Sequence, residues 1–105
     1  MPPRREQLSR LLNDLQAELQ QLGLWETLPP APEAFESSTP FFADTMDFSQ
    51  WLQWVFIARF RAILADDHPL PAQCDVAPLA EEALHGLDKP TGPLIELLRR
   101  FDNHF

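Results

Sequence analysis

The sequence is poor in the residues that build covalent or metal-bound frameworks. It contains one cysteine, Cys74, among 105 residues. A single thiol forms no internal disulfide and supplies no thiolate cluster, which agrees with a reducing compartment. The histidines show no i, i+4 pair and there is no Cys-x-x-Cys spacing, so we expect no metal and no cofactor. The 3 glycines are dispersed and cannot form a phosphate-binding loop.

Long apolar runs and positive charge are also scarce. No run approaches the ~20 apolar residues of a membrane span, and no secretory signal is recognisable, so we expect a cytoplasmic protein with no membrane association. The chain has 8 basic and 16 acidic residues, a net charge of −8 that repels nucleic-acid phosphates. We therefore expect no direct nucleic-acid binding. The alternative is a folded patch that gathers Arg99 and Arg100 with the N-terminal arginines.

Helical periodicity dominates what is present, and no stretch alternates apolar and polar residues as a strand does. The predicted helices run from after Pro3 to about Leu22, from Asp47 to Asp66 or Asp67, from Asp75 or Ala77 to about Gly86, and from Thr91 or Gly92 onward. The expected fold is all-α, a four-helix bundle formed by a single domain over residues 1–105. The leucine stripe of the first helix faces the core, and it is also compatible with a homodimer.

Local signals mark where two of these helices end and begin. Gly23 follows the last leucine of the first helix, where a left-handed residue ends a helix. Asp47 is placed to cap the second helix, with Gln50 as its partner in a capping box, and Asp44 is the competing cap.

A proline-rich connection of roughly 20 residues, from Trp25 to Met46, joins the first two helices. A connection of this length is long for a compact domain. We call it the strap. It carries apolar residues that a disordered linker lacks, namely Trp25, Leu28, Phe35, Phe41, Phe42 and Met46. We expect the strap to lie across the bundle and bury these side chains. The alternative is that its phenylalanines form a docking surface for a partner.

The second helix is apolar nearly all round, so we expect the other helices to pack around it. At helical period, the polar residues share a narrow strip opposite the apolar face: Ser49, Gln50, Gln53 and Arg61. Arg59 instead falls in the middle of the apolar face, between Phe56 and Ile63, where a guanidinium must find partners.

We expect Arg59 to be buried and paired, so that it clamps the strap to the bundle. The candidate partners are strap carbonyls and the carboxylates of Asp44, Asp47, Glu81 and Glu82. The alternative is that Arg59 receives the carboxylate or phosphate of a ligand in a pocket lined by Trp51, Trp54 and Phe42.

No arrangement of residues predicts catalysis. Cys74 and His68 lie in a proline-rich loop that gives no reason for their side chains to align, so we expect a half-buried inert thiol. Asp66 and Asp67 with His68 are compatible with a cation site, but a solvated helix end is the simpler interpretation.

The central sequence resembles a known family. The run STPFFADTMDFSQWLQWVFIARFRAIL, a short LP-containing turn, and then DVAPLAEEAL are similar to the YqcC-like family of small bacterial proteins. The resemblance implies an all-helical bundle whose biochemical role is not established. It also implies an association with tRNA pseudouridine synthase C, because some members are encoded beside that enzyme and carry its label. Ala58 stands where members usually have proline, which removes a kink.

The label does not imply that this chain is an enzyme. A pseudouridine synthase needs a catalytic aspartate on a large α/β scaffold with a basic RNA cleft, and an acidic helical chain of this size supplies neither. We expect an interaction or adaptor protein that binds an RNA-modification enzyme; the alternative is a binder of a small anionic ligand. The candidate residues for either site are Arg59, Trp51, Trp54, Phe41 and Phe42.

Overall fold

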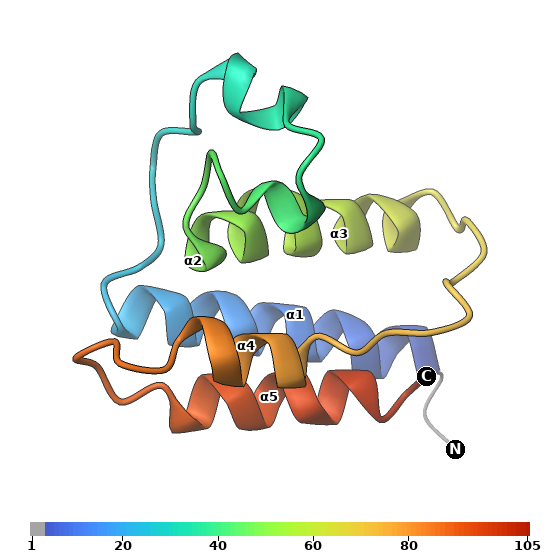
Figure 1. The fold of residues 1–105 in the computed structure, drawn as a ribbon. Coiled ribbons are helices and arrows are strands. Elements are labelled where there is room, and N and C mark those ends of the chain that lie inside the picture. Colours follow the sequence, from blue (N-terminus) through green and yellow to red (C-terminus); the bar gives the residue numbers. More distant parts are fainter. Residues whose placement is uncertain (1–3) are drawn as a thin grey trace.

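The computed structural model describes residues 4–105, which form helices and turns without a strand (Figure 1). The four predicted helical segments are all present, so the all-α four-helix bundle is confirmed. They are α1 (Arg4–Gln21), a continuous segment made of α2 (Phe48–Trp51), the π-helical η3 (Leu52–Ile57) and α3 (Ala58–Ala65), then α4 (Ala77–Ala83) and α5 (Gly92–Asp102). Across these residues, no helix has the length and apolar character needed to cross a membrane.

The leucine stripe of α1 lies inside the bundle. Its four central leucines are at most 1% exposed: Leu8, Leu12, Leu15 and Leu19. They pack in one core with α5 and the second helical segment, so they do not form an exposed seam for a homodimer. The predicted stop is confirmed, because α1 ends at Gln21 and Gly23 adopts a left-handed φ of 73°.

Aromatic rings join α5 to the second helical segment. Phe101 of α5 is fully buried, with its ring centroid 5.2 Å from that of Phe56 and 4.8 Å from that of Phe60. Both contacts are edge-to-face, the geometry that aromatic quadrupoles favour. The second helical segment is thereby fixed against the bundle on one side, which leaves its other side for the strap.

The second helical segment begins as predicted from the sequence, but its middle differs from the predicted regular α-helix. Asp47 and Gln50 form the predicted capping box, in which the Asp47 N–H donates to Gln50 Oε1 at 2.8 Å. The π-helical η3 then makes a wider turn than an α-helix, with i→i+5 hydrogen bonds. That wide turn holds one extra residue, so every later side chain is rotated by about one position around the axis.

The rotation corrects the predicted core face. Phe60, 6% exposed, takes the inward position that an uninterrupted helix gives to Arg59. Leu64 packs on the core in the next turn, and Ala62 is exposed although it was predicted to face inward. The expectation of a helix buried on most sides holds only for η3, where five of six residues are buried.

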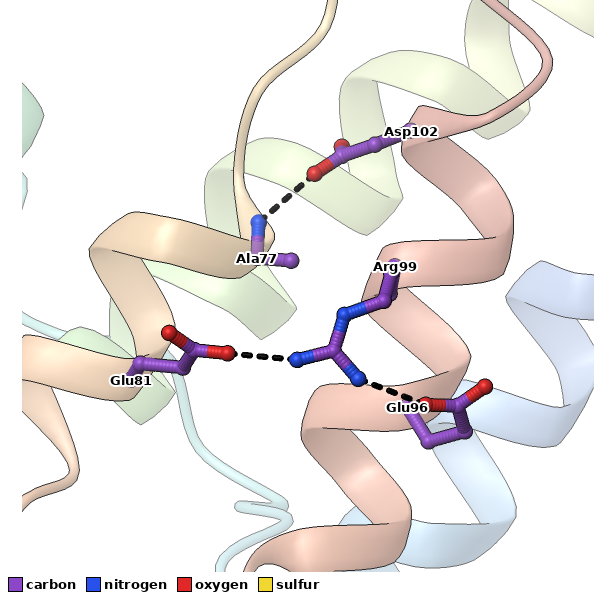
Figure 2. Close-up of polar contacts among 5 residues, drawn as sticks. All are labelled: Ala77, Glu81, Glu96, Arg99 and Asp102. Carbon is purple, nitrogen blue, oxygen red and sulfur yellow. Dashed lines mark hydrogen bonds and ion pairs between the residues drawn. The ribbon is translucent and has the colours of Figure 1, made fainter.

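A carboxylate at the end of α5 caps the N-terminus of α4. Asp102 accepts hydrogen bonds from the backbone N–H groups of Val76 at 3.0 Å and Ala77 at 2.7 Å, so it caps a helix that has no cap in its own sequence. Figure 2 shows the contact between Asp102 and Ala77, and it shows Arg99 of α5 placed between Glu81 of α4 and Glu96 of α5. These contacts hold α4 against α5 at two points.

The Asp102 carboxylate also lowers the reactivity of the single thiol, Cys74. Cys74 Sγ lies 3.3 Å from Asp102 Oδ1, and burial together with this hydrogen bond raises the pKa of Cys74 to about 12. The thiol is therefore protonated at neutral pH and a poor nucleophile. The predicted half-buried inert thiol is confirmed.

We predict that Asp102→Ala lowers the free energy of unfolding by about 2 kcal/mol, because two backbone donors at the start of α4 lose a charged acceptor. Denaturant titration measures the change. Asp88→Ala is the control, because Asp88 is exposed and bonds to no side chain within residues 4–105; it should stay within about 0.5 kcal/mol of the parent. Equal effects of the two substitutions would show that Asp102 does not act as a cap.

Candidate functional site

The strap folds back on itself over the second helical segment. In Figure 1 it leaves the end of α1, arches over the side of α2 and α3 that faces away from α1, and returns to α2. It contains two short 3₁₀ turns, η1 (Pro32–Glu36) and η2 (Pro40–Phe42). Ser37 donates a hydrogen bond to the Asp44 carboxylate, and Thr45 Oγ1 donates to the Ala34 carbonyl at 2.7 Å. The strap is therefore an internally braced loop.

A buried amide attaches the first part of the strap to the helix. Gln53 is 4% exposed. Its Oε1 accepts from the Glu26 N–H at 2.8 Å, and its Nε2 donates to the Glu26 carbonyl at 2.7 Å. One side chain thus satisfies both backbone groups of one strap residue, as a neighbouring strand does in a sheet. Gln53 belongs to the polar strip that the sequence predicts, and the strap covers this strip at Gln53.

The Glu26 side chain adds a second attachment. Its carboxylate accepts from the indole Nε1 of Trp54 at 3.2 Å and lies 3.3 Å from Gln50 Nε2. Glu26 and Gln53 together attach the strap to the bundle, which is the role that the sequence analysis predicted for Arg59. A glutamine inside an otherwise apolar run was the signal available in the sequence, since a buried amide requires partners.

The strap buries fewer of its apolar residues than expected. Met46 is 6% exposed and lies in the core, whereas Phe41 is 47% and Leu28 79% exposed. The prediction of burial is wrong for these last two. The remaining three, Trp25, Phe35 and Phe42, are half-buried.

Two consecutive phenylalanines in the strap have unfavourable backbone conformations. Phe41 and Phe42 have φ values of 59° and 53°, in the left-handed region that costs a residue with a Cβ about 1–2 kcal/mol. The turn holds Phe41 edge-to-face on Trp51, with centroids 5.1 Å apart. Phe42 packs instead near Phe35, at 6.4 Å. The two rings therefore belong to different surface features.

Each ring lines its own hollow. The first, which we call the Arg59 hollow, has a volume of ≈ 450 Å³ and is lined by Phe35, Phe42, Trp54, Val55, Ala58 and Arg59. The second, which we call the Phe41 hollow, has a volume of ≈ 290 Å³ between the strap and α4 and is lined by Phe41, Ala43, Met46, Asp47, Phe48, Leu79 and Ala83. The structure thus brings Arg59, Trp54 and Phe42 together as predicted, but Trp51 packs beside Phe41 and does not line the same hollow.

Arg59 is exposed and forms no hydrogen bond or ion pair with another residue between 4 and 105. The prediction that it is buried and paired is wrong, because η3 rotates it out of the core. The proposed partners are engaged elsewhere or solvated: Asp44 accepts from Ser37, and Glu81 pairs with Arg99. The hydrogen bond from Ser37 also holds the pKa of Asp44 below its usual value.

Two other predicted features of the charged residues remain to be placed: the basic patch and a candidate metal-binding cluster. Arg10 and Arg100 line a common hollow between the first half of α1 and the end of α5, so the alternative of a shared basic patch is met in part. Each of them also lies near a glutamate on its own helix, at 3.1 Å for Glu6 and 3.8 Å for Glu96, which offsets their charge. In the part of the chain that the structure describes, no three His, Cys, Asp or Glu side chains gather closely enough to hold a metal ion.

The fold and its surface define a class: a small all-α protein that displays aromatic residues on a braced strap. A family profile described as DUF446, tRNA pseudouridine synthase C, matches residues 7–104, so the chain belongs to this family. An uncharacterized protein of Haemophilus influenzae is 43% identical in an alignment 103 positions long, which covers 95% of this chain and 97% of that protein.

A solved structure agrees with the fold. The solution NMR structure of the protein YqcC from E. coli has a TM-score of 0.81 and 36% sequence identity, covering 96% of this chain and 86% of that one. The four-helix arrangement is therefore that of a structurally known relative.

The synthase name belongs to a longer relative. A protein of Pectobacterium carotovorum named tRNA pseudouridine synthase C is 41% identical over 68 residues, which are 65% of this chain but only 18% of that protein. The proteins that this chain covers almost completely have no activity in their names. The synthase name therefore does not assign catalysis to this chain.

We predict that Gln53→Leu lowers the free energy of unfolding by about 2–4 kcal/mol, because the Glu26 N–H and carbonyl both lose their partner. Denaturant titration measures the loss, and amide hydrogen exchange at Glu26 should accelerate more than in the core of α1. Gln20→Leu, at an exposed position on α1, is the matched control and should change little. If Glu26 exchanged at the parental rate in Gln53→Leu, the strap would be held by other contacts.

We predict that Arg59→Gln changes the free energy of unfolding by no more than about 0.5 kcal/mol, because the side chain is exposed and unpaired. Phe60→Ala should cost about 3–5 kcal/mol, because the ring fills the core. An uninterrupted α-helix predicts the opposite order for these two neighbours. Thermal and denaturant unfolding of both variants therefore test the one-residue rotation produced by η3.

Proposed function

We propose that this chain is a protein-docking module that binds a tRNA pseudouridine synthase C through its strap. The observation that carries the proposal is the conformation of Phe41. The residue is 47% exposed although its backbone is held at an unfavourable positive φ. Strain combined with exposure of an aromatic ring does not stabilise the fold, and such strain is common where a protein binds something.

The strap is prepared for binding before a partner arrives. It is braced by the Ser37–Asp44 and Thr45–Ala34 hydrogen bonds, and it is fixed to the helix by Gln53. A partner that packs on Phe41 therefore has little chain to order, which preserves affinity. Apolar hollows lie on both sides of the η2 turn, so the surface accepts side chains next to the exposed ring.

The identity of the partner is supported by the longer relative. In the Pectobacterium protein, a segment similar to this chain is part of a polypeptide named tRNA pseudouridine synthase C. Covalent joining gives two modules a high effective concentration, so a separate chain needs a docking surface to reach the same proximity. The net charge of −8 also complements an enzyme whose surface attracts RNA phosphates. The proposal places this chain in the cytoplasm and gives it no direct contact with nucleic acid.

A second candidate function is the binding of a free small anion in the Arg59 hollow. The unpaired guanidinium beside aromatic rings favours it. A site for a small molecule, however, usually encloses most of its ligand, and this hollow is open to solvent.

We predict that Phe41→Ser weakens binding to the synthase from the same organism by about tenfold or more, as truncation of a central aromatic anchor does. Isothermal titration calorimetry of the two purified proteins measures the affinity. Leu87→Ser is the matched control, because Leu87 is a large apolar residue that is 40% exposed and lies outside the strap. It should leave the affinity nearly unchanged.

Phe41→Gly separates binding from folding. Glycine adopts a φ of 59° without strain, which offsets the lost ring contact with Trp51, so the melting temperature should stay close to that of the parent while binding is lost. No binding by the parent chain, or equal binding by Phe41→Ser and Leu87→Ser, would refute the proposed docking surface.

A further inference from the structure

The Arg59 hollow has a single free polar side chain in its lining. Four of its six lining residues have apolar side chains. The indole nitrogen of a fifth, Trp54, already donates to Glu26 at 3.2 Å. Only the guanidinium of Arg59 remains, and it is unpaired within residues 4–105. A group that enters this hollow therefore meets apolar walls and one cation.

These features select the chemistry of the group. A guanidinium offers a planar fork of N–H donors and no acceptor, a geometry that matches the two oxygens of a carboxylate. The rings of Phe35 and Phe42 and the side chain of Val55 favour a neighbouring apolar group, whose burial adds to the ion pair. Elsewhere the chain is acidic and repels carboxylates, so the pairing depends on local contact with Arg59.

The position of the hollow indicates which molecule supplies the carboxylate. It lies beside η2, because Phe42 lines it while the adjacent Phe41 is exposed on the other side of the same turn. A partner surface that covers both sides of the η2 turn contacts Phe41 and the Arg59 hollow together. Resting on the docking function proposed above, we infer that the Arg59 hollow receives an aspartate or glutamate of the protein partner, flanked there by an apolar residue.

The test compares charge variants of the full chain in binding to the synthase. Arg59→Glu should weaken binding by about tenfold or more, because it places two carboxylates together. Arg59→Lys should give a smaller loss, because it keeps the charge but not the fork. Arg100→Glu is the matched control: it changes the net charge equally, but it lies on α5 outside the hollow. It should bind like the parent.

Charge reversal on the partner identifies the matching residue. Surface aspartates and glutamates of the synthase are replaced in turn by arginine. The matching substitution should weaken binding of the parent chain and restore binding of Arg59→Glu, as in a double-mutant cycle. If the complex forms and Arg59→Glu binds like Arg100→Glu, the inference is wrong while the docking function stands.

A second measurement decides the chemistry even if no complex forms, which would end the docking proposal. The folded chain is titrated with phenylacetate, an apolar carboxylate, and in a separate experiment with phenylacetamide, the neutral analogue of phenylacetate. NMR chemical shifts report binding. Phenylacetate should shift the signals of Phe42, Trp54 and Arg59 with a dissociation constant on the order of 10 mM, typical of so small a ligand. Phenylacetamide, and phenylacetate with the Arg59→Gln variant, should bind several times more weakly.

Two results of this titration count against the inference. Equal binding of the acid and the amide would show that Arg59 does not select a carboxylate. Micromolar binding of phenylacetate, in the range of a dedicated small-molecule site, would show that the hollow serves a free small acid and not a side chain of a partner.

Discussion

The surface of this protein depends on one buried amide. Gln53 holds the N–H and the carbonyl of Glu26, and this fixes the path of the strap at the point where it leaves α1. The Glu26 carboxylate then receives the indole N–H of Trp54, which leaves the faces of that ring to line a hollow. Farther along, Phe35 and Phe42 form the opposite wall only because the strap returns over the helix. The strap, the Arg59 hollow and the exposed Phe41 therefore share one structural origin.

The π-helical segment contributes the second constraint. The sequence places Arg59 in line with the buried face of the helix, where it would require an internal partner. The wide turn of η3 gives that inward place to Phe60 and moves the guanidinium to the edge of an aromatic hollow. π-Helical turns occur frequently at functional sites, and here the physical effect is definite: a cation that an ordinary helix would bury is presented at the surface.

The family relationship and the chemistry of the single thiol agree that the synthase name does not assign catalysis to this chain. The relatives of similar length have no activity in their names, and the synthase name comes with a longer protein that includes a similar segment. The single thiol is protonated and hydrogen-bonded to Asp102, which is typical of a structural cysteine and not of a nucleophile. What the chain does display is a strap braced by its own hydrogen bonds, with Phe41 exposed on it.

The sequence by itself determined the helices, because their signals are local. The apolar period of α1, the stop at Gly23 and the capping box of Asp47 and Gln50 each depend on residues within a few positions of one another, and all three were predicted correctly. The resemblance of the central run also gave the correct family. For the site, the sequence indicated most of the residues and the strap that carries several of them.

Only the tertiary structure decided how those residues are used. Gln53 is buried because a segment 27 positions earlier covers it, and α4 begins where it does because Asp102, 25 positions later than Ala77, caps it. The period of a helix contains no information about such distant partners. It also assumes a constant turn, so a single wide turn in η3 was enough to exchange the environments of Arg59 and Phe60.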